Sequence, residues 1–170
     1  KDAIAINLSG RQRMLSQRIT KSLLALPHTK SDAERAQTIE EFREATKMFD
    51  QTLSAFAQGG EVVGGDGKPT TLNKVTNRLS ATFISEAQQI WLPTRNKVAP
   101  YFANNIAIPE SVLAESQSEM LSKNLQILKL MNKLTSALEN DSRKQANLLR
   151  ILQTIVFFIA LTNFIIVVRK

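Results

Sequence analysis

The chain has 170 residues, a net charge of +7 and no cysteine, so it can form one domain with a core but no disulfide or thiolate metal site. The basic residues are scattered, and the only aromatics are eight Phe, one Trp and one Tyr, which argues against a nucleic-acid-binding surface. His28 is the only histidine and follows Pro27 at an expected turn, so we expect an exposed loop residue rather than a zinc ligand or a triad member.

The first expected helix covers residues 2–26 and ends at Pro27. On a helical wheel, one of its faces collects apolar residues that we expect in the core: Ile4, Leu8, Leu15, Ile19 and Leu26. Arg11 and Arg18 share one edge of this face, where we expect them to form structural salt bridges with acidic residues of a neighbouring helix.

Arg13 points to nearly the opposite side of this helix, where Gly10 lies one turn earlier. Glycine inside a helix costs about 1 kcal/mol relative to alanine, and close approach of a ligand or a second backbone would compensate. If this face paired with its copy in a second chain, two Arg13 side chains would repel near the twofold axis, and a planar oxyanion would relieve the repulsion. A simply solvated Arg13 fits the wheel equally well.

Ser31 and Glu34 in the segment "SDAE" match a capping box, which predicts a second helix running to about Gln58. This helix offers several apolar residues for burial: Ala36, Ile39, Phe42, Met48, Phe49, Leu53 and Phe56. Residues 59–69 contain five of the six glycines and are expected to form a loop.

A third helix is expected over residues 72–104, and Pro93 and Pro100 should kink or split it. Its apolar side is expected to comprise Leu72, Val75, Leu79, Phe83, Ile90 and Trp91. No sequence pattern in the chain predicts a β-strand of any length.

Pro109 is expected to open the fourth and longest helix. Residues spaced by sevens form one seam suited to packing along another helix: Leu113, Met120, Ile127 and Leu134. A companion seam at the same spacing comprises Asn124, Met131, Leu138 and Leu152. We expect this helix to run unbroken from the domain into the membrane. The heptad pattern weakens near Asp141 and Gln145, so we expect looser packing at this junction.

Residues 151–168 contain no charged residue and are bracketed by Arg150 and Arg169. At about 1.5 Å per residue the run spans roughly 27 Å, close to the thickness of the bilayer hydrocarbon core. We therefore expect a transmembrane helix rather than a buried core helix, with an orientation that the flanking charges do not decide. The expected fold is all-α, an antiparallel four-helix bundle in residues 1–147, followed in residues 148–170 by a transmembrane helix and the start of the cytoplasmic side.

The segment "AINLSGRQRMLSQRI", residues 5–19, resembles the P-box that begins the periplasmic sensor domain of nitrate/nitrite histidine kinases of the NarX/NarQ type. It is more similar still to the PilJ-type sensor domains of chemoreceptors, histidine kinases and diguanylate cyclases. The similarity continues more weakly through the Gly-rich loop, "QIWLPTRNKV" and "ILKLMNKLTSALE". This resemblance implies a homodimer of four-helix bundles placed between two transmembrane helices, with the sensor domain in the periplasm and the anchor in the inner membrane.

In the nitrate-sensing branch, the resemblance implies that one anion binds between the first helices of the two subunits. The matching residues here are Arg13 and Gly10, with Asn7 and Gln17 flanking the site. Arg11 and Gln12 stand where the kinases carry small or apolar residues, and Gln17 stands where they carry tyrosine. These departures are typical of the PilJ-type branch.

The sequence is therefore interpreted as a ligand-binding input domain that senses a small anion, nitrate first and nitrite second. No catalytic, metal or cofactor residues are expected, because the chain lacks Cys, a second His, a phosphate loop and a convergent carboxylate pair. Two alternatives stay open: a sensor of the same fold that responds to a protein partner such as a pilin, and a structural dimerisation module. An enzyme is the least favoured class, although a catalytic output domain would be compatible with the full-length protein. Both ends of the chain are expected to continue in that protein.

Overall fold

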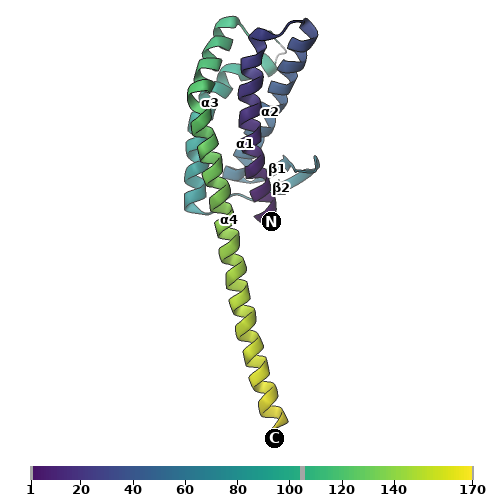
Figure 1. Cartoon of the computed structure of the whole chain (residues 1–170), viewed down its shortest axis with the longest axis vertical. Helices are drawn as coiled ribbons and strands as arrows, with labels where there is room; N and C mark the ends of the chain where they lie inside the picture. The colour runs from purple at the N-terminus through teal and green to yellow at the C-terminus, as the bar shows by residue number, and fades with distance from the viewer. Residues whose placement is uncertain (1, 104–105, 170) are drawn as a thin grey trace.

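The computed structural model describes residues 2–103 and 106–169, and within them four long helices dominate (Figure 1). The elements in chain order are α1 Asp2–Ala25, a 3-10 turn Leu26–His28, α2 Asp32–Gln58, β1 Gly60–Val63, β2 Pro69–Leu72, α3 Arg78–Ala103 and α4 Glu110–Val168. Helix α1 packs against α2 and α4, and α3 packs against α2 and α4. Successive helices run in opposite directions, and the apolar end of α4 extends far beyond the packed helices (Figure 1).

The predicted starts and ends of the first two helices are confirmed. Helix α1 ends at Ala25, just before Pro27, and the hydroxyl of Ser31 accepts a hydrogen bond of 3.2 Å from the backbone N–H of Glu34. The carboxylate of Glu34 accepts from the backbone N–H of Lys30 at 2.7 Å, one residue before the N-cap. These bonds satisfy N–H groups that a helix start otherwise leaves unpaired.

Large side chains from all four helices fill the core. Those that are almost fully buried are Trp91, Phe42, Phe49, Phe56, Leu8, Leu15, Ile19, Leu23, Leu26, Leu53, Ile84 and Met120. Trp91 and Phe49 meet edge to face, with ring centroids 5.0 Å apart. The core face predicted for α1 is confirmed except at Ile4, which is 38% exposed because it lies near the end of α1, beside the hairpin of β1 and β2.

The prediction of a plain loop after α2 is wrong. Strands β1 and β2 pair antiparallel, from Gly60 opposite Leu72 to Val63 opposite Pro69, and the turn between them includes Gly67 at φ 79°. Helix α3 accordingly begins at Arg78 rather than near residue 72, since residues 69–72 are used in the strand. The side chain of Asn77 then accepts from the N–H of Ser80 at 3.1 Å, which marks the true helix start.

Two further expectations for burial and helix breaking are corrected. Leu79 is 57% exposed and Ala36 is exposed, so neither contributes to the core. Pro93 and Pro100 do not split α3, which runs through both. Both prolines lie on the exposed side of the helix, where water can satisfy the carbonyl groups that proline leaves without a donor.

Helix α4 has 59 residues and is unbroken, as predicted. Its main heptad seam is buried at all four positions: Leu113, Met120, Ile127 and Leu134. In the companion seam Met131 is buried, Asn124 and Leu138 are half-buried, and Leu152 is 49% exposed because it lies beyond the packed helices.

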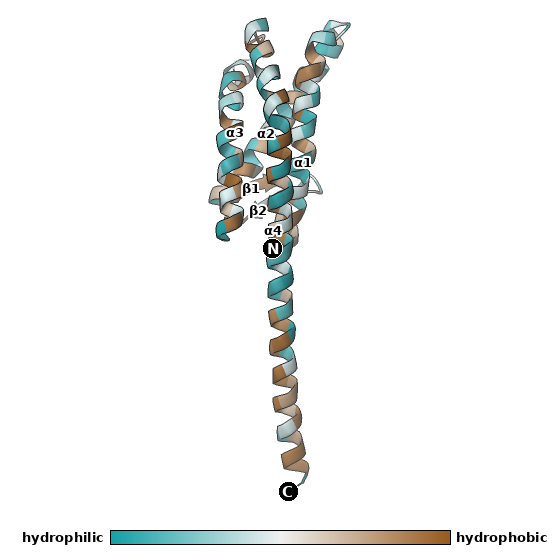
Figure 2. Cartoon of the chain, turned by 60° about the vertical axis from the view of Figure 1, so that its left-hand side comes forward, coloured by the Kyte–Doolittle hydropathy of each residue, from teal (hydrophilic) through white to brown (hydrophobic). Residues whose placement is uncertain are grey.

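The far end of α4 has the composition of a membrane span. Hydrophobic residues cover almost the whole of this end, in contrast to the more polar stretch above it (Figure 2). The most apolar window has a mean hydropathy of 2.5, and none of it is buried against the rest of the chain. An exposed apolar surface of this size needs a nonaqueous environment, so α4 is compatible with a transmembrane helix.

Candidate functional site

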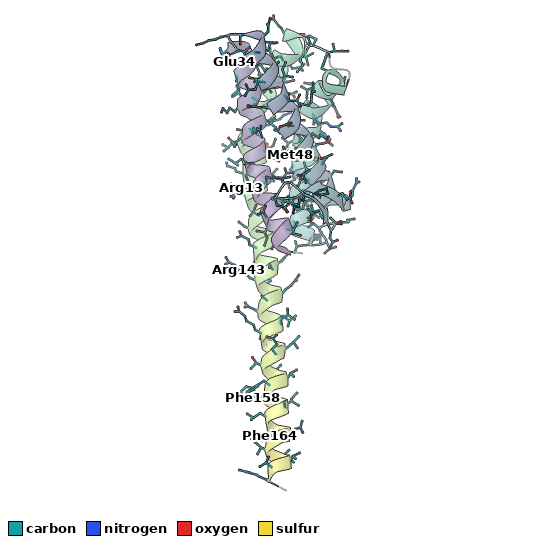
Figure 3. The ribbon with its side chains drawn as sticks, turned by 90° about the vertical axis from the view of Figure 1, so that its right-hand side faces the viewer. Arg13, Glu34, Met48, Arg143, Phe158 and Phe164 are labelled. Carbon is teal, nitrogen blue, oxygen red and sulfur yellow. The ribbon has the colours of Figure 1, made fainter. Side chains whose placement is uncertain are left out.

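Arg13 lies on the outer surface of the packed helices, midway along their length (Figure 3). Its Nη1 donates a hydrogen bond of 2.9 Å to Oδ1 of Asn132 on α4. Among the residues that the structure describes, no carboxylate lies within ion-pair distance of Arg13. The guanidinium charge at this position is therefore not neutralised by the chain itself.

Gly10, which is half-buried, lies one turn before Arg13 on α1. A Cβ atom placed on Gly10 would be 3.9 Å from Nη2 of Arg13, which is an ordinary van der Waals contact. The packing of this single chain therefore does not require glycine at position 10. The missing side chain instead leaves free surface beside the guanidinium on the solvent side of α1.

Gln17, one turn after Arg13, follows the same edge of α1. Its Nε2 donates to Oδ1 of Asn124 on α4 at 3.1 Å, and Gln117 on α4 donates to the backbone oxygen of Leu23 at 2.8 Å. Polar side chains thus connect α1 to α4 along the seam that contains Arg13. The structure brings Arg13, Gly10 and Gln17 together on this seam.

Asn7 lies elsewhere, against the hairpin of β1 and β2. Its Oδ1 would be 2.9 Å from a Cβ atom placed on Gly65, and it lines a cleft of about 480 Å³ together with Asp66 and Lys68. Asn7 is six residues before Arg13, which corresponds to about 9 Å along the helix and a turn of about 120° around it. Within one chain, Asn7 is therefore not part of the group around Arg13.

Arg11 and Arg18 are structural, but only one of them forms the predicted kind of contact. Arg18 lies 4.0 Å from the carboxylate of Glu44 on α2, as predicted. Arg11 does not pair with a carboxylate: its Nη1 and Nη2 donate to the backbone oxygens of Gly64 and Val63 at 2.7 and 2.6 Å. These carbonyls face α1 because the hairpin folds back onto it, and partial burial lowers the pKa of the Arg11 guanidinium.

Three apolar side chains are exposed on the outer sides of α1 and α4. Met14 on α1 is 56% exposed, and Leu121 and Leu125 on α4 are 61% and 58% exposed. On a helical wheel Leu121 and Leu125 lie beside the edge of α4 that contacts α1. We call these three residues, together with Gly10 and Arg13, the α1–α4 face.

Other charged groups serve structural roles away from this face. Lys97 on α3 is hydrogen-bonded to Glu115 and Glu119 on α4, and Thr94 donates to Glu119 at 2.8 Å. The hydrogen bonds to Glu115 and Glu119 raise the pKa of Lys97, and the hydrogen bond from Lys97 lowers the pKa of Glu119. In the described part of the chain, no group of three or more His, Asp or Glu side chains could hold a metal ion.

Sequence reasoning did not find the residues of α4 that contact this site. Asn124 was expected only as part of a packing seam, and Asn132 was not singled out. Both are asparagines at partly or fully exposed positions of a helix, where asparagine has low helix propensity. That mismatch is the only signal that the sequence offers for them.

Comparison with known proteins agrees with the PilJ-type resemblance. The family model PilJ, described as the N-terminal part of type IV pili methyl-accepting chemotaxis transducers, matches residues 1–126. No curated protein and no solved structure matches the chain. The family indicates a sensory input domain of a chemotaxis transducer, and the apolar end of α4 fits a membrane-anchored receptor. The match spans most of the chain, including α1, α2, α3 and the first part of α4, and the chain belongs to the PilJ family.

Proposed function

We propose that this chain is the input domain of a bacterial transmembrane receptor that binds a small planar oxyanion, nitrate first and nitrite second. The anion binds between two copies of the chain, each an antiparallel four-helix bundle, whose α1 helices meet at Gly10. Arg13 of each copy donates hydrogen bonds to it. The domain lies in the periplasm, and α4 anchors it in the inner membrane.

The observation that carries this proposal is the state of Arg13. It is an exposed arginine with no carboxylate partner among the described residues, beside a glycine that the packing of its own chain does not require. An arginine fork offers two parallel hydrogen bonds to a planar oxyanion. Two such forks facing each other repel when empty and are bridged when an anion is bound.

The α1–α4 face supports the homodimer. Met14, Leu121 and Leu125 expose apolar surface on the outer sides of α1 and α4, and covering this surface with a second copy removes it from water. Gly10 lets two α1 backbones approach closely at the centre of the contact. A twofold axis through this point places both Arg13 side chains at the same anion.

Signal transmission follows from the continuity of α4. The helix that contacts α1 through Asn132 is the helix that reaches the apolar segment without a break. Shifts of about 1–2 Å are typical when helices move at an interface. The anion can shift the equilibrium between two positions of α1 relative to α4 only by the difference between its affinities for them.

In this proposal the input domain itself has no catalytic role, and the output signal comes from another part of the receptor. The family favours a chemotaxis transducer as the whole receptor, and a histidine kinase and a diguanylate cyclase are the alternatives. A second candidate is a sensor that responds to a protein partner such as a pilin. The exposed apolar residues of the α1–α4 face would then contact that partner, and Arg13 would be dispensable. The third candidate function is that of a purely structural dimerisation module.

The test is a melting-temperature screen of the full chain in lipid nanodiscs, with nitrate, nitrite, chloride, sulfate, phosphate and small carboxylates at matched ionic strength. A ligand at a hundred times its dissociation constant adds about 2.7 kcal/mol to the stability. We expect a nitrate-selective rise that disappears in Arg13→Ala. No selective rise for any anion would reject the anion-sensor proposal in favour of a protein-partner sensor or a structural module.

A further inference from the structure

Among the described residues outside α1, Asn132 on α4 is the hydrogen-bond partner of the Arg13 side chain. Oδ1 of Asn132 accepts a hydrogen bond of 2.9 Å from Nη1 of Arg13, across 119 positions of sequence. Because a guanidinium only donates hydrogen bonds, the amide oxygen must face Arg13 and the amide NH₂ group must point elsewhere. Asn132 also lies outside residues 1–126, the part of the chain that the family model matches.

We propose that Asn132 is the positioning residue of the anion site, orienting Arg13 so that its free edge faces the ligand. This inference rests on the proposed function and adds a residue from the signalling helix to it. Of the three nitrogen atoms of the Arg13 guanidinium, only Nη1 has a hydrogen-bond partner among the described residues. Nε and Nη2 therefore form a free two-donor edge, and two parallel N–H groups are what a planar oxyanion accepts.

The chemistry of an amide at position 132 suits this task. Its neutral oxygen holds the guanidinium without neutralising it, so Arg13 keeps its full attraction for an anion. A carboxylate at the same position would pair with Arg13 and repel the anion. An apolar side chain would leave the long arginine free among many rotamers, and ordering it on binding would weaken the affinity.

Because Asn132 is on α4 and Arg13 is on α1, the geometry of the proposed site depends on both helices. The orientation of Arg13 depends on the position of α4 relative to α1, and the bond from Gln17 to Asn124, 3.1 Å long, holds the same two helices together. An anion that prefers the oriented arginine therefore prefers one offset of α4 against α1. The ligand thereby acts directly on the helix that leads to the membrane.

The experiment measures nitrate binding by calorimetric titration of the full chain in lipid nanodiscs. The variants are Asn132→Ala and Asn132→Asp, with Asn140→Asp as the control, since Asn140 is exposed on the same helix, about 12 Å further along. We expect Asn132→Ala to raise the dissociation constant about tenfold. Asn132→Asp should abolish measurable binding while its melting temperature stays at or above that of the native chain, and Asn140→Asp should bind within about twofold of native.

Each other result overturns the inference. If Asn132→Asp binds nitrate like the native chain, Asn132 does not orient Arg13. If both variants at position 132 lose melting temperature and affinity in parallel, the residue has only a structural role. If Asn140→Asp weakens binding as much as Asn132→Asp, the effect is one of net charge. If the native chain binds no nitrate, the proposed function itself fails, and this inference fails with it.

Discussion

Replacing Arg11 by alanine removes two hydrogen bonds that hold the hairpin of β1 and β2 against α1. The two bonds to the backbone oxygens of Gly64 and Val63 measure 2.7 and 2.6 Å and come from a charged donor. A hydrogen bond from a charged group contributes about 1.5–3 kcal/mol when it is well shielded. Because Arg11 is only partly buried, we expect the two bonds together to contribute about 2 kcal/mol to the free energy of unfolding.

For a chain of this size, about 2 kcal/mol corresponds to a fall in melting temperature of roughly 4–8 °C. The local effect should be larger than the global one, because the hairpin loses two of its bonds to α1 while the helical core stays intact. Hydrogen exchange at residues 62–68 should accelerate in Arg11→Ala, and exchange in the core of α2 should stay close to native.

Arg18→Ala is the matched control, since Arg18 is an arginine on the same edge of the same helix. Its carboxylate partner Glu44 is 4.0 Å away, and the two side chains are 38% and 56% exposed. An exposed ion pair of this kind contributes about 0–1 kcal/mol, so the melting temperature should change little. Equal effects of the two substitutions on melting and on hairpin exchange would refute the argument that the Arg11 contacts hold the hairpin.

Three further predictions concern single residues. Gly10→Ala should leave the stability of the chain unchanged or raise it by up to about 1 kcal/mol, since its Cβ would lie 3.9 Å from Arg13; nitrate titration should nevertheless show weaker binding, and a large loss of melting temperature would contradict the geometry. Gly64→Ala should lower the melting temperature clearly, because its Cβ would lie 2.9 Å from Oδ1 of Asp66 and 3.1 Å from the backbone oxygen of Lys68. The pKa of Glu119 is lowered by its hydrogen bond from Lys97, so its stabilising effect is present above the ordinary pKa of the carboxyl group and is lost as the pH falls through the lowered value. Acid melting curves of native and Glu119→Gln chains should therefore converge at low pH, and curves that stay parallel would argue against this contribution.

The long helices were predictable because their patterns are repeated many times. Leu113, Met120, Ile127 and Leu134 hold one heptad seam, and all four are buried in α4. The capping residue Ser31 was predictable because a helix start has a local chemical requirement that few residue types meet. The apolar end of α4 was recognisable from composition alone.

The hairpin was not predictable from local pattern. Each strand has four residues, and the glycines around them are typical of a loop. What holds the strands in place is partly a contact with Arg11, more than fifty positions away in the sequence, and such a contact leaves no trace in local periodicity. The predicted start of α3, near residue 72, is too early in the chain. Leu72 and Val75 are buried like residues of an apolar helix face, but neither is helical.

The candidate site divides in the same way. The wheel placed Arg13 and Gly10 together on the face opposite the core, and the structure has both there. Periodicity within α1 could not indicate that Asn132 accepts from Arg13, since that contact depends on the register of α4 against α1. It also could not separate Asn7 from this group, because the hairpin that Asn7 contacts was not expected.

The central claim is that one oxyanion is shared by two copies of Arg13. Calorimetric titration of the full chain in nanodiscs with nitrate tests this claim most directly, because it reports stoichiometry as well as affinity. The account predicts one nitrate bound per two chains and no measurable binding in Arg13→Ala. Binding of one nitrate per chain, binding that survives in Arg13→Ala, or no binding to the native chain would contradict it.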